Sequence, residues 1–116
     1  MTEIIIIRHG ETEWNKTGRF QGHSDVPLSE EGRAQAETLG RNLVLDHADA
    51  IYASDLTRAI ETATPLAKRF GLTVMPDPLL RELNFGAWEG RNFQDVNAES
   101  PDAMKRFYSD PERVDI

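Results

Sequence analysis

The sequence predicts an α/β domain with a mainly parallel sheet. Short apolar runs, of a length that suits strands, alternate along the chain with stretches in which apolar residues recur at helical spacing. The resulting order is strand, helix, strand, helix, strand, which is typical of βαβ units. The chain has 116 residues, enough for one domain, or most of one, with a buried core.

The first predicted strand is the isoleucine run Ile4–Ile7. β-branched residues without polar alternation are typical of a short strand that is buried on both faces. Arg8, His9 and Gly10 follow directly. Because α/β sheets bind ligands at the carboxyl ends of their strands, Arg8 and His9 are candidates for a site that takes an anion. Read in isolation, these residues could also be the polar end of an ordinary strand.

The next elements are a loop and a helix. Residues 10–28 are predicted to form a loop, because their glycines and aromatic residues show no helical or strand period. Residues 30–45 are predicted to be helical, since their apolar residues return every three or four positions. Ser29 is the expected N-cap, and two acidic residues in the first turn suit the helix dipole.

A second βαβ unit is expected to follow. Residues 50–53 predict a strand, Ser54 is a candidate cap for the next helix, and Gly71 is the expected end of that helix. Residues 72–75 predict the third strand. Two short helices are predicted after it, Phe93–Glu99 and Asp102–Tyr108.

Polar side chains follow each of the three predicted strands. The first strand leads to Arg8 and His9, the second to Arg58, and the third to Glu82. If the strands are parallel, these residues converge on one edge of the sheet. A nucleophile, cations and an acid are the groups that phosphoryl transfer requires.

Composition excludes several classes of function. A net charge of −7 argues against a nucleic-acid surface. No apolar run approaches the roughly 20 residues needed to cross a bilayer, so no membrane partner is expected. The chain has no cysteine, which excludes disulfides and thiolate metal sites and suits a reducing compartment. The expected location is cytoplasmic.

The block Arg8-His9-Gly10-Glu11-Thr12, followed by Trp14-Asn15, resembles the signature of the histidine phosphatase superfamily, which includes the cofactor-dependent phosphoglycerate mutases. Further blocks resemble the later landmarks of that family in the same order. They are Asp25-Val26-Pro27-Leu28-Ser29, Gly32, Ser54–Ala59, Thr62-Ala63 and Arg81–Gly90. The last block is more similar to the phosphatase branches, including broad-specificity and α-ribazole phosphatases, than to the glycolytic mutases.

The resemblance implies a role for five residues. His9 is the nucleophile that becomes phosphorylated, and Glu82 donates and accepts the proton. Arg8 and Arg58 bind the phosphoryl group, and Asn15 is a further contact in the phosphate pocket. The residue types suit these roles, because guanidinium groups fit phosphate oxygens. A neutral imidazole can attack phosphorus when its other nitrogen donates to a carbonyl.

Each role has a plainer alternative. Glu82 could form a solvated ion pair with its neighbour Arg81. Arg58 could be an ordinary exposed helix residue, and Asn15 could simply form a turn.

The resemblance also implies a three-layer α/β sandwich with a mainly parallel central sheet, of the phosphoglycerate mutase type, whose C-terminal part is missing here. Residues 1–116 are the expected N-terminal part of a single histidine phosphatase domain, with the start of its cap region at about 87–116. Members of this family continue further and carry a second active-site histidine. His23 and His47 lie too early to replace it and are expected at the surface. The favoured explanation is a fragment of a longer enzyme, impaired when alone; a natural short form is the alternative.

The resulting functional prediction is a phosphomonoester hydrolase that acts through phosphohistidine on a small phosphorylated metabolite. A cofactor-dependent phosphoglycerate mutase is the alternative within the same class. An inactive phosphate-binding or regulatory domain is the alternative of another class. No cofactor and no metal are expected, because the chain has no histidines at i, i+4 and no carboxylates at metal-ligand spacing. The sequence does not decide between a monomer and a homo-oligomer.

Overall fold

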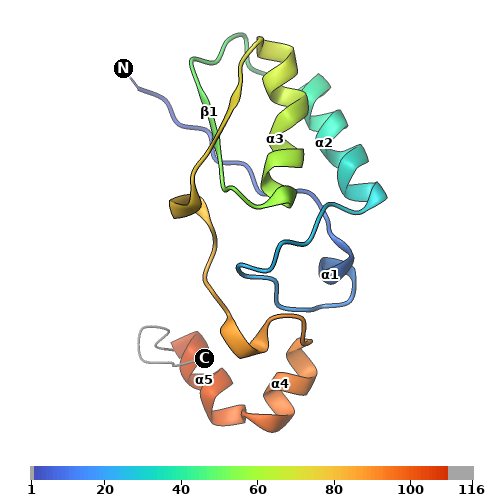
Figure 1. Ribbon diagram of the computed structural model, residues 1–116, viewed down its shortest axis with the longest axis vertical. Helices are drawn as coiled ribbons and strands as arrows, with labels where there is room; N and C mark the ends of the chain where they lie inside the picture. Colours follow the sequence, from blue (N-terminus) through green and yellow to red (C-terminus); the bar gives the residue numbers. More distant parts are fainter. Residues whose placement is uncertain (1, 110–116) are drawn as a thin grey trace.

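The computed structural model describes residues 2–109, and the chain is elongated, with principal extents of 48 × 34 × 20 Å. Figure 1 shows a sheet part at one end and a pair of helices at the other, joined by irregular segments. The sheet part contains β1 (Ile51–Ala53), β2 (Val74–Pro76), α2 (Glu30–Asn42) and α3 (Thr57–Phe70). The other end contains α4 (Phe93–Glu99) and α5 (Pro101–Ser109), and α1 (Glu13–Lys16) lies between the two parts. Residues 110–116 of the expected cap region lie outside the described residues.

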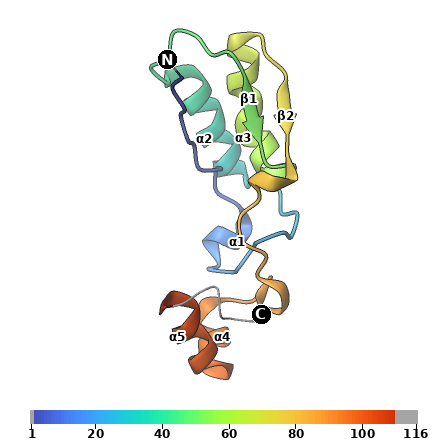
Figure 2. The same cartoon turned by 90° about the vertical axis from the view of Figure 1, so that its left-hand side faces the viewer.

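Strands β1 and β2 form a parallel two-stranded sheet in which Ile51 pairs with Val74 and Ala53 pairs with Pro76. Helix α3 connects the two strands and packs against both of them and against α2. Figure 2 shows the two helices side by side along the strands. The predicted α/β class and the parallel sheet are therefore confirmed.

The first predicted strand is wrong for the structure as it stands. Ile4–Ile7 form no strand, and Ile4 and Ile6 are 79% and 92% exposed. A strand buried on both faces needs neighbours that pair with its backbone and layers that cover its side chains. Neither β1 nor β2 pairs with this segment among the described residues. The apolar composition of Ile4–Ile7 suits a buried strand, but no described part of the chain pairs with this segment or covers its side chains.

Helix α2 begins where the sequence predicts. The hydroxyl of Ser29 accepts a hydrogen bond from the N–H of Gly32 at 3.1 Å, which caps the helix. The helix ends at Asn42, three residues before the predicted end at 45. The loop prediction for residues 10–28 misses the one-turn helix α1, which is too short to show a period.

Helix α3 does not use the predicted Ser54 cap: its N-cap residue is Leu56, whose side chain makes no capping hydrogen bond. It begins at Thr57 rather than directly after Ser54. The carboxylate of Asp25, far away in the sequence, accepts from the N–H of Thr57 at 2.7 Å and from its hydroxyl at 3.0 Å. An acid at this helix end also complements the dipole. Gly71 ends the helix with φ of 65°, as predicted.

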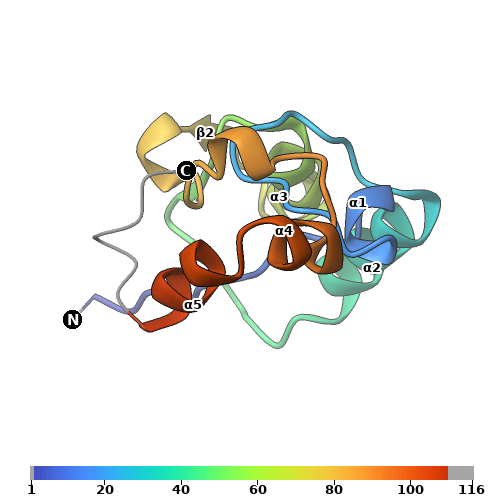
Figure 3. The same ribbon diagram turned by 90° about the horizontal axis from the view of Figure 1, so that it is seen from below.

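Helices α4 and α5 confirm the two short helices predicted after the sheet, and they pack against each other (Figure 3). Their core contains buried Trp88, Val96 and Met104. Phe20, from the loop after α1, lies 5.5 Å from the Trp88 ring and joins this core. Within the described part of the chain, no helix is long and apolar enough to span a membrane.

Candidate active site

The ends of the two parallel strands bring Arg58 and Glu82 into contact. Arg58 lies in the first turn of α3, which follows β1. Glu82 lies beyond the 3₁₀ helix η1 (Pro78–Leu80), which follows β2. Nη2 of Arg58 donates to Oε1 of Glu82 at 2.8 Å. Because parallel strands share one carboxyl edge, the predicted approach of an arginine and a carboxylate occurs at that edge.

The backbone holds the Arg58 guanidinium in a fixed direction. Its Nη1 donates to the carbonyl of Ser24 at 2.7 Å, and its Nη2 donates to the carbonyl of Gly22 at 2.6 Å. Arg58 is only 2% exposed, so it is not an ordinary exposed helix residue. Carbonyl groups orient the cation without cancelling its charge. An anion that reaches this site meets a pre-oriented positive group.

Glu82 does not pair with its sequence neighbour. Arg81 instead donates from Nε and Nη2 to the two carboxylate oxygens of Asp55, each at 2.6 Å. The hydrogen bond from Arg81 lowers the pKa of Asp55 below its ordinary value. The alternative in which Glu82 forms an ion pair with Arg81 is therefore wrong. The half-exposed Glu82 carboxylate faces Arg58.

His9 is held in one ring orientation. Its Nδ1 lies 2.6 Å from the carbonyl oxygen of Gly10. Because a carbonyl only accepts, Nδ1 donates, and Nε2 of the neutral ring keeps its lone pair. This tautomer is the one that a nucleophilic imidazole requires.

Thr62 attaches the His9–Gly10 segment to the helix that carries Arg58. The N–H of Gly10 donates to the Thr62 hydroxyl at 2.9 Å, and that hydroxyl donates to the carbonyl of Arg58 at 2.7 Å. A side chain at Gly10 has no room, because its Cβ would lie 2.7 Å from the carbonyl oxygen of Gly32 in α2. Gly10 is needed for this close approach to α2.

Among the described residues, Arg8 and Asn15 form no hydrogen bond or ion pair with Arg58 or Glu82. Arg8 is exposed. The amide oxygen of Asn15 accepts from the N–H of Thr12 at 2.9 Å, and the Thr12 hydroxyl accepts from the N–H of Asn15 at 3.1 Å, which completes the capping box of α1. Asn15 therefore does form a turn. Because its amide oxygen is used in the capping box, a phosphate could be contacted only by its NH2 group.

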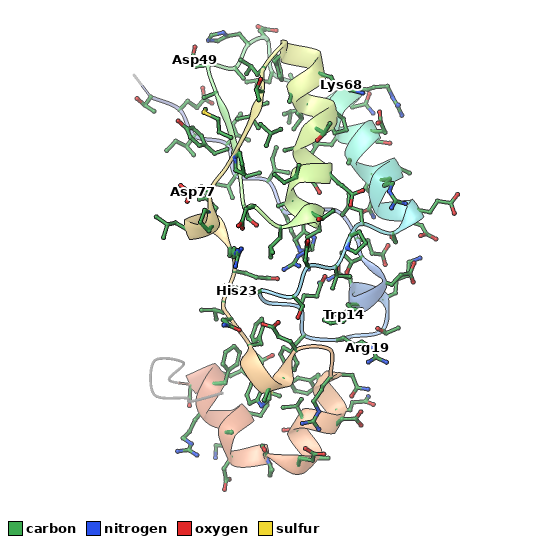
Figure 4. All side chains as sticks on the ribbon, in the orientation of Figure 1. Trp14, Arg19, His23, Asp49, Lys68 and Asp77 are labelled. Atoms are coloured by element: carbon green, nitrogen blue, oxygen red, sulfur yellow. The ribbon has the colours of Figure 1, made fainter. Side chains whose placement is uncertain are left out.

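The two histidines expected at the surface, His23 and His47, differ in their exposure to solvent. The side chain of His47 is 73% exposed, as predicted. His23 is half-buried, and its Nε2 lies 3.1 Å from the carbonyl oxygen of Glu82. Figure 4 shows His23 in the middle of the molecule, between the sheet part and helices α4 and α5.

Three polar residues near the site carry no predicted role. Thr62 belongs to a block that resembles the family. Its position four residues after Arg58 places both on the same face of the helix, and this spacing is the sequence feature that could have indicated its role. Gln21 is buried and accepts from the Thr12 hydroxyl at 2.7 Å. Glu89 accepts hydrogen bonds from residues 23, 24 and 85. Burial by itself raises the pKa of Glu89, but the bonds from the Ser24 hydroxyl and the backbone outweigh it and the pKa is lowered.

Within residues 2–109, no three histidine, aspartate or glutamate side chains gather as a metal site requires.

The sequence pattern described as histidine phosphatase superfamily (branch 1) matches residues 4–116. Phosphoserine phosphatase 1 from Hydrogenobacter thermophilus is 36% identical over 100% of this chain and 55% of that protein. Phosphoglycerate mutase-like protein 4 from Arabidopsis thaliana is 41% identical over 98% of this chain and 50% of that protein. A solved mycobacterial glucosyl-3-phosphoglycerate phosphatase in complex with VO3 is 39% identical, with a TM-score of 0.79 over 85% of this chain and 49% of that one. The chain spans about half the length of the curated relatives it matches.

Proposed function

The chain belongs to the histidine phosphatase superfamily, and we propose that the full-length protein hydrolyses small phosphomonoesters through a phosphohistidine. The observation that carries the proposal is the Arg58–Glu82 contact, with the His9–Gly10 segment tied to the same helix by the Gly10–Thr62 bond. A cation, an acid and a nucleophile thus belong to one connected framework. Two of the relatives are named as phosphatases of small phosphorylated compounds.

In the first proposed step, Nε2 of His9 attacks phosphorus, and the bond to the leaving oxygen breaks. The arginines Arg8 and Arg58 stabilise the charge on the phosphoryl oxygens, and Asn15 adds a hydrogen bond from its NH2 group. Glu82 gives its proton to the leaving oxygen. An incoming phosphomonoester displaces the Glu82 carboxylate from Nη2 of Arg58, and the freed carboxylate takes up a proton from solvent before it protonates the leaving oxygen.

In the second step, water attacks the phosphohistidine. Glu82, now a carboxylate, takes a proton from that water, and the N–P bond breaks. Free phosphate leaves, and His9 returns to its starting form.

Two other functions are alternatives to this proposal. A phosphoglycerate mutase would pass the phosphoryl group from His9 to a second hydroxyl instead of water, and the mutase-like relative favours it. An inactive binding or regulatory domain would bind phosphate without turnover. A cytoplasmic location is part of the main proposal, since a chain without cysteine suits a reducing compartment.

Hydrolysis by the full-length protein is expected to survive an excess of chelator. In the proposed site, guanidinium groups and not a divalent ion neutralise the phosphoryl charge. Release of p-nitrophenol from p-nitrophenyl phosphate, measured with and without chelator, checks this. Loss of turnover that one divalent ion restores would show that the charge is met by a metal.

Glu82→Gln is expected to slow alkyl phosphates far more than p-nitrophenyl phosphate. An alkoxide leaving group needs a proton as the bond breaks, whereas p-nitrophenolate leaves with little protonation. The comparison is the ratio of kcat/KM for the two substrates in the wild type and the variant. An equal loss on both would assign Glu82 to binding or structure.

A further inference from the structure

Glu89 joins two segments that surround the Arg58–Glu82 pair. Its Oε2 accepts from the backbone N–H of His23 at 3.0 Å and of Phe85 at 3.1 Å. Its Oε1 accepts from the hydroxyl of Ser24. One half-buried carboxylate therefore satisfies donors from the loop before α2 and from the chain after Glu82.

The loop residues 22–24 are the ones that hold Arg58. Their carbonyls at Gly22 and Ser24 accept from the two guanidinium nitrogens. Gly22 has φ of +55°, and a Cβ there would collide with Oε2 of Glu89. The close packing of Glu89 on this loop thus fixes the backbone whose carbonyls direct Arg58.

The segment after β2 is held to the same loop. Nε2 of His23 donates to the carbonyl of Glu82, and the N–H of Phe85 donates to Glu89. Both bonds keep Glu82 close to the loop and so close to Arg58.

We propose that Glu89 is a positioning residue for phosphate binding and turnover, which acts through the loop 22–24 and the segment 82–85 on Arg58 and Glu82. It does not touch the phosphoryl group. This role rests on the proposed function, because it assumes that Arg58 binds phosphate. Moving a charged group by about 1 Å from its productive place can cost on the order of 10²-fold in rate.

The two obvious substitutions differ in their expected effect. Glu89→Ala leaves two backbone N–H groups and a hydroxyl without their acceptor. Glu89→Gln keeps one oxygen for the two N–H groups, and its NH2 can donate to Ser24, whose hydroxyl can also accept. Hydrogen-bond geometry, more than the charge of Glu89, is therefore expected to decide the outcome.

The test measures full-length variants with p-nitrophenyl phosphate for turnover and inorganic phosphate for binding. Glu89→Ala is expected to lower kcat/KM and to weaken phosphate binding by about 10- to 100-fold. Glu89→Gln should stay within about fivefold of the wild type. The matched control is Glu99→Ala, because Glu99 forms only an exposed ion pair with Arg91 and should change neither quantity.

A double-mutant cycle separates positioning from general destabilisation. If Glu89 acts through Arg58, Glu89→Ala should cost much less when Arg58 is already alanine. Should Glu89→Ala not fold, Ser24→Ala removes one of the same bonds, and about a threefold to tenfold weaker phosphate binding is expected.

The outcomes distinguish a failure of the role proposed for Glu89 from a failure of the proposed phosphatase function. A folded Glu89→Ala with wild-type phosphate binding, an equal cost in both Arg58 backgrounds, or an unaffected Ser24→Ala would overturn the role of Glu89 and leave the proposed function intact. A wild-type protein that neither hydrolyses the ester nor binds phosphate would overturn both.

Discussion

Replacing His9 with alanine is expected to reduce turnover by the full-length protein by about 10⁴-fold or more, the scale on which removal of a nucleophile acts. The reaction as proposed passes through Nε2 of His9, and residues 1–116 contain no cysteine that could take its place. The ring makes one local hydrogen bond, to Gly10, so the change should alter stability by only about 1 kcal/mol. Steady-state kinetics and a thermal melt measure the two effects separately.

His47→Ala is the matched control for this variant. The His47 side chain is 73% exposed and pairs only with Asp49 on the surface, so turnover should be unchanged. Comparable turnover in His9→Ala and the wild type would rule out His9 as the nucleophile.

Arg58→Ala is expected to lower kcat/KM by at least about 10²- to 10³-fold, as removal of other donors that stabilise transition-state charge does. The variant also removes the Arg58 donor from the carbonyl of Gly22 and leaves the carbonyl of Ser24 with only the N–H of Val26, so some loss of stability should accompany it. Arg58→Lys keeps the charge but not the planar fork and should recover only part of the activity.

The control for Arg58 is Arg33→Ala. Arg33 forms an exposed ion pair with Glu61 at 3.1 Å, which contributes little to stability or to any site. If Arg58→Ala folds and retains wild-type kcat/KM, phosphate is bound elsewhere.

Local chemistry explains what the sequence predicts well. Helix α2 follows from its own period and from the Ser29 cap, both of which act over a few residues. The Arg58–Glu82 contact was predictable because both residues follow strands and parallel strands share an edge. His9 was recognisable from its block of neighbours.

Contacts over long sequence distances explain what it predicts poorly. Ile4–Ile7 has strand composition, but burial depends on pairing that the described chain does not provide. The acid at the start of α3 comes from Asp25, which no local pattern indicates. Glu89 carries no sign of its three partners in the sequence, because its role arises only when two distant segments meet.

The most direct measurement is to trap the phosphorylated protein. The full-length protein is incubated with a ³²P-labelled phosphoester, quenched in alkali and digested, and the labelled peptide is sequenced. The expected result is an acid-labile label on the peptide that contains His9, absent from His9→Ala and present in His23→Ala and His47→Ala. Label on a serine or an aspartate, or a His9→Ala variant that is labelled like the wild type, would contradict phosphoryl transfer through His9.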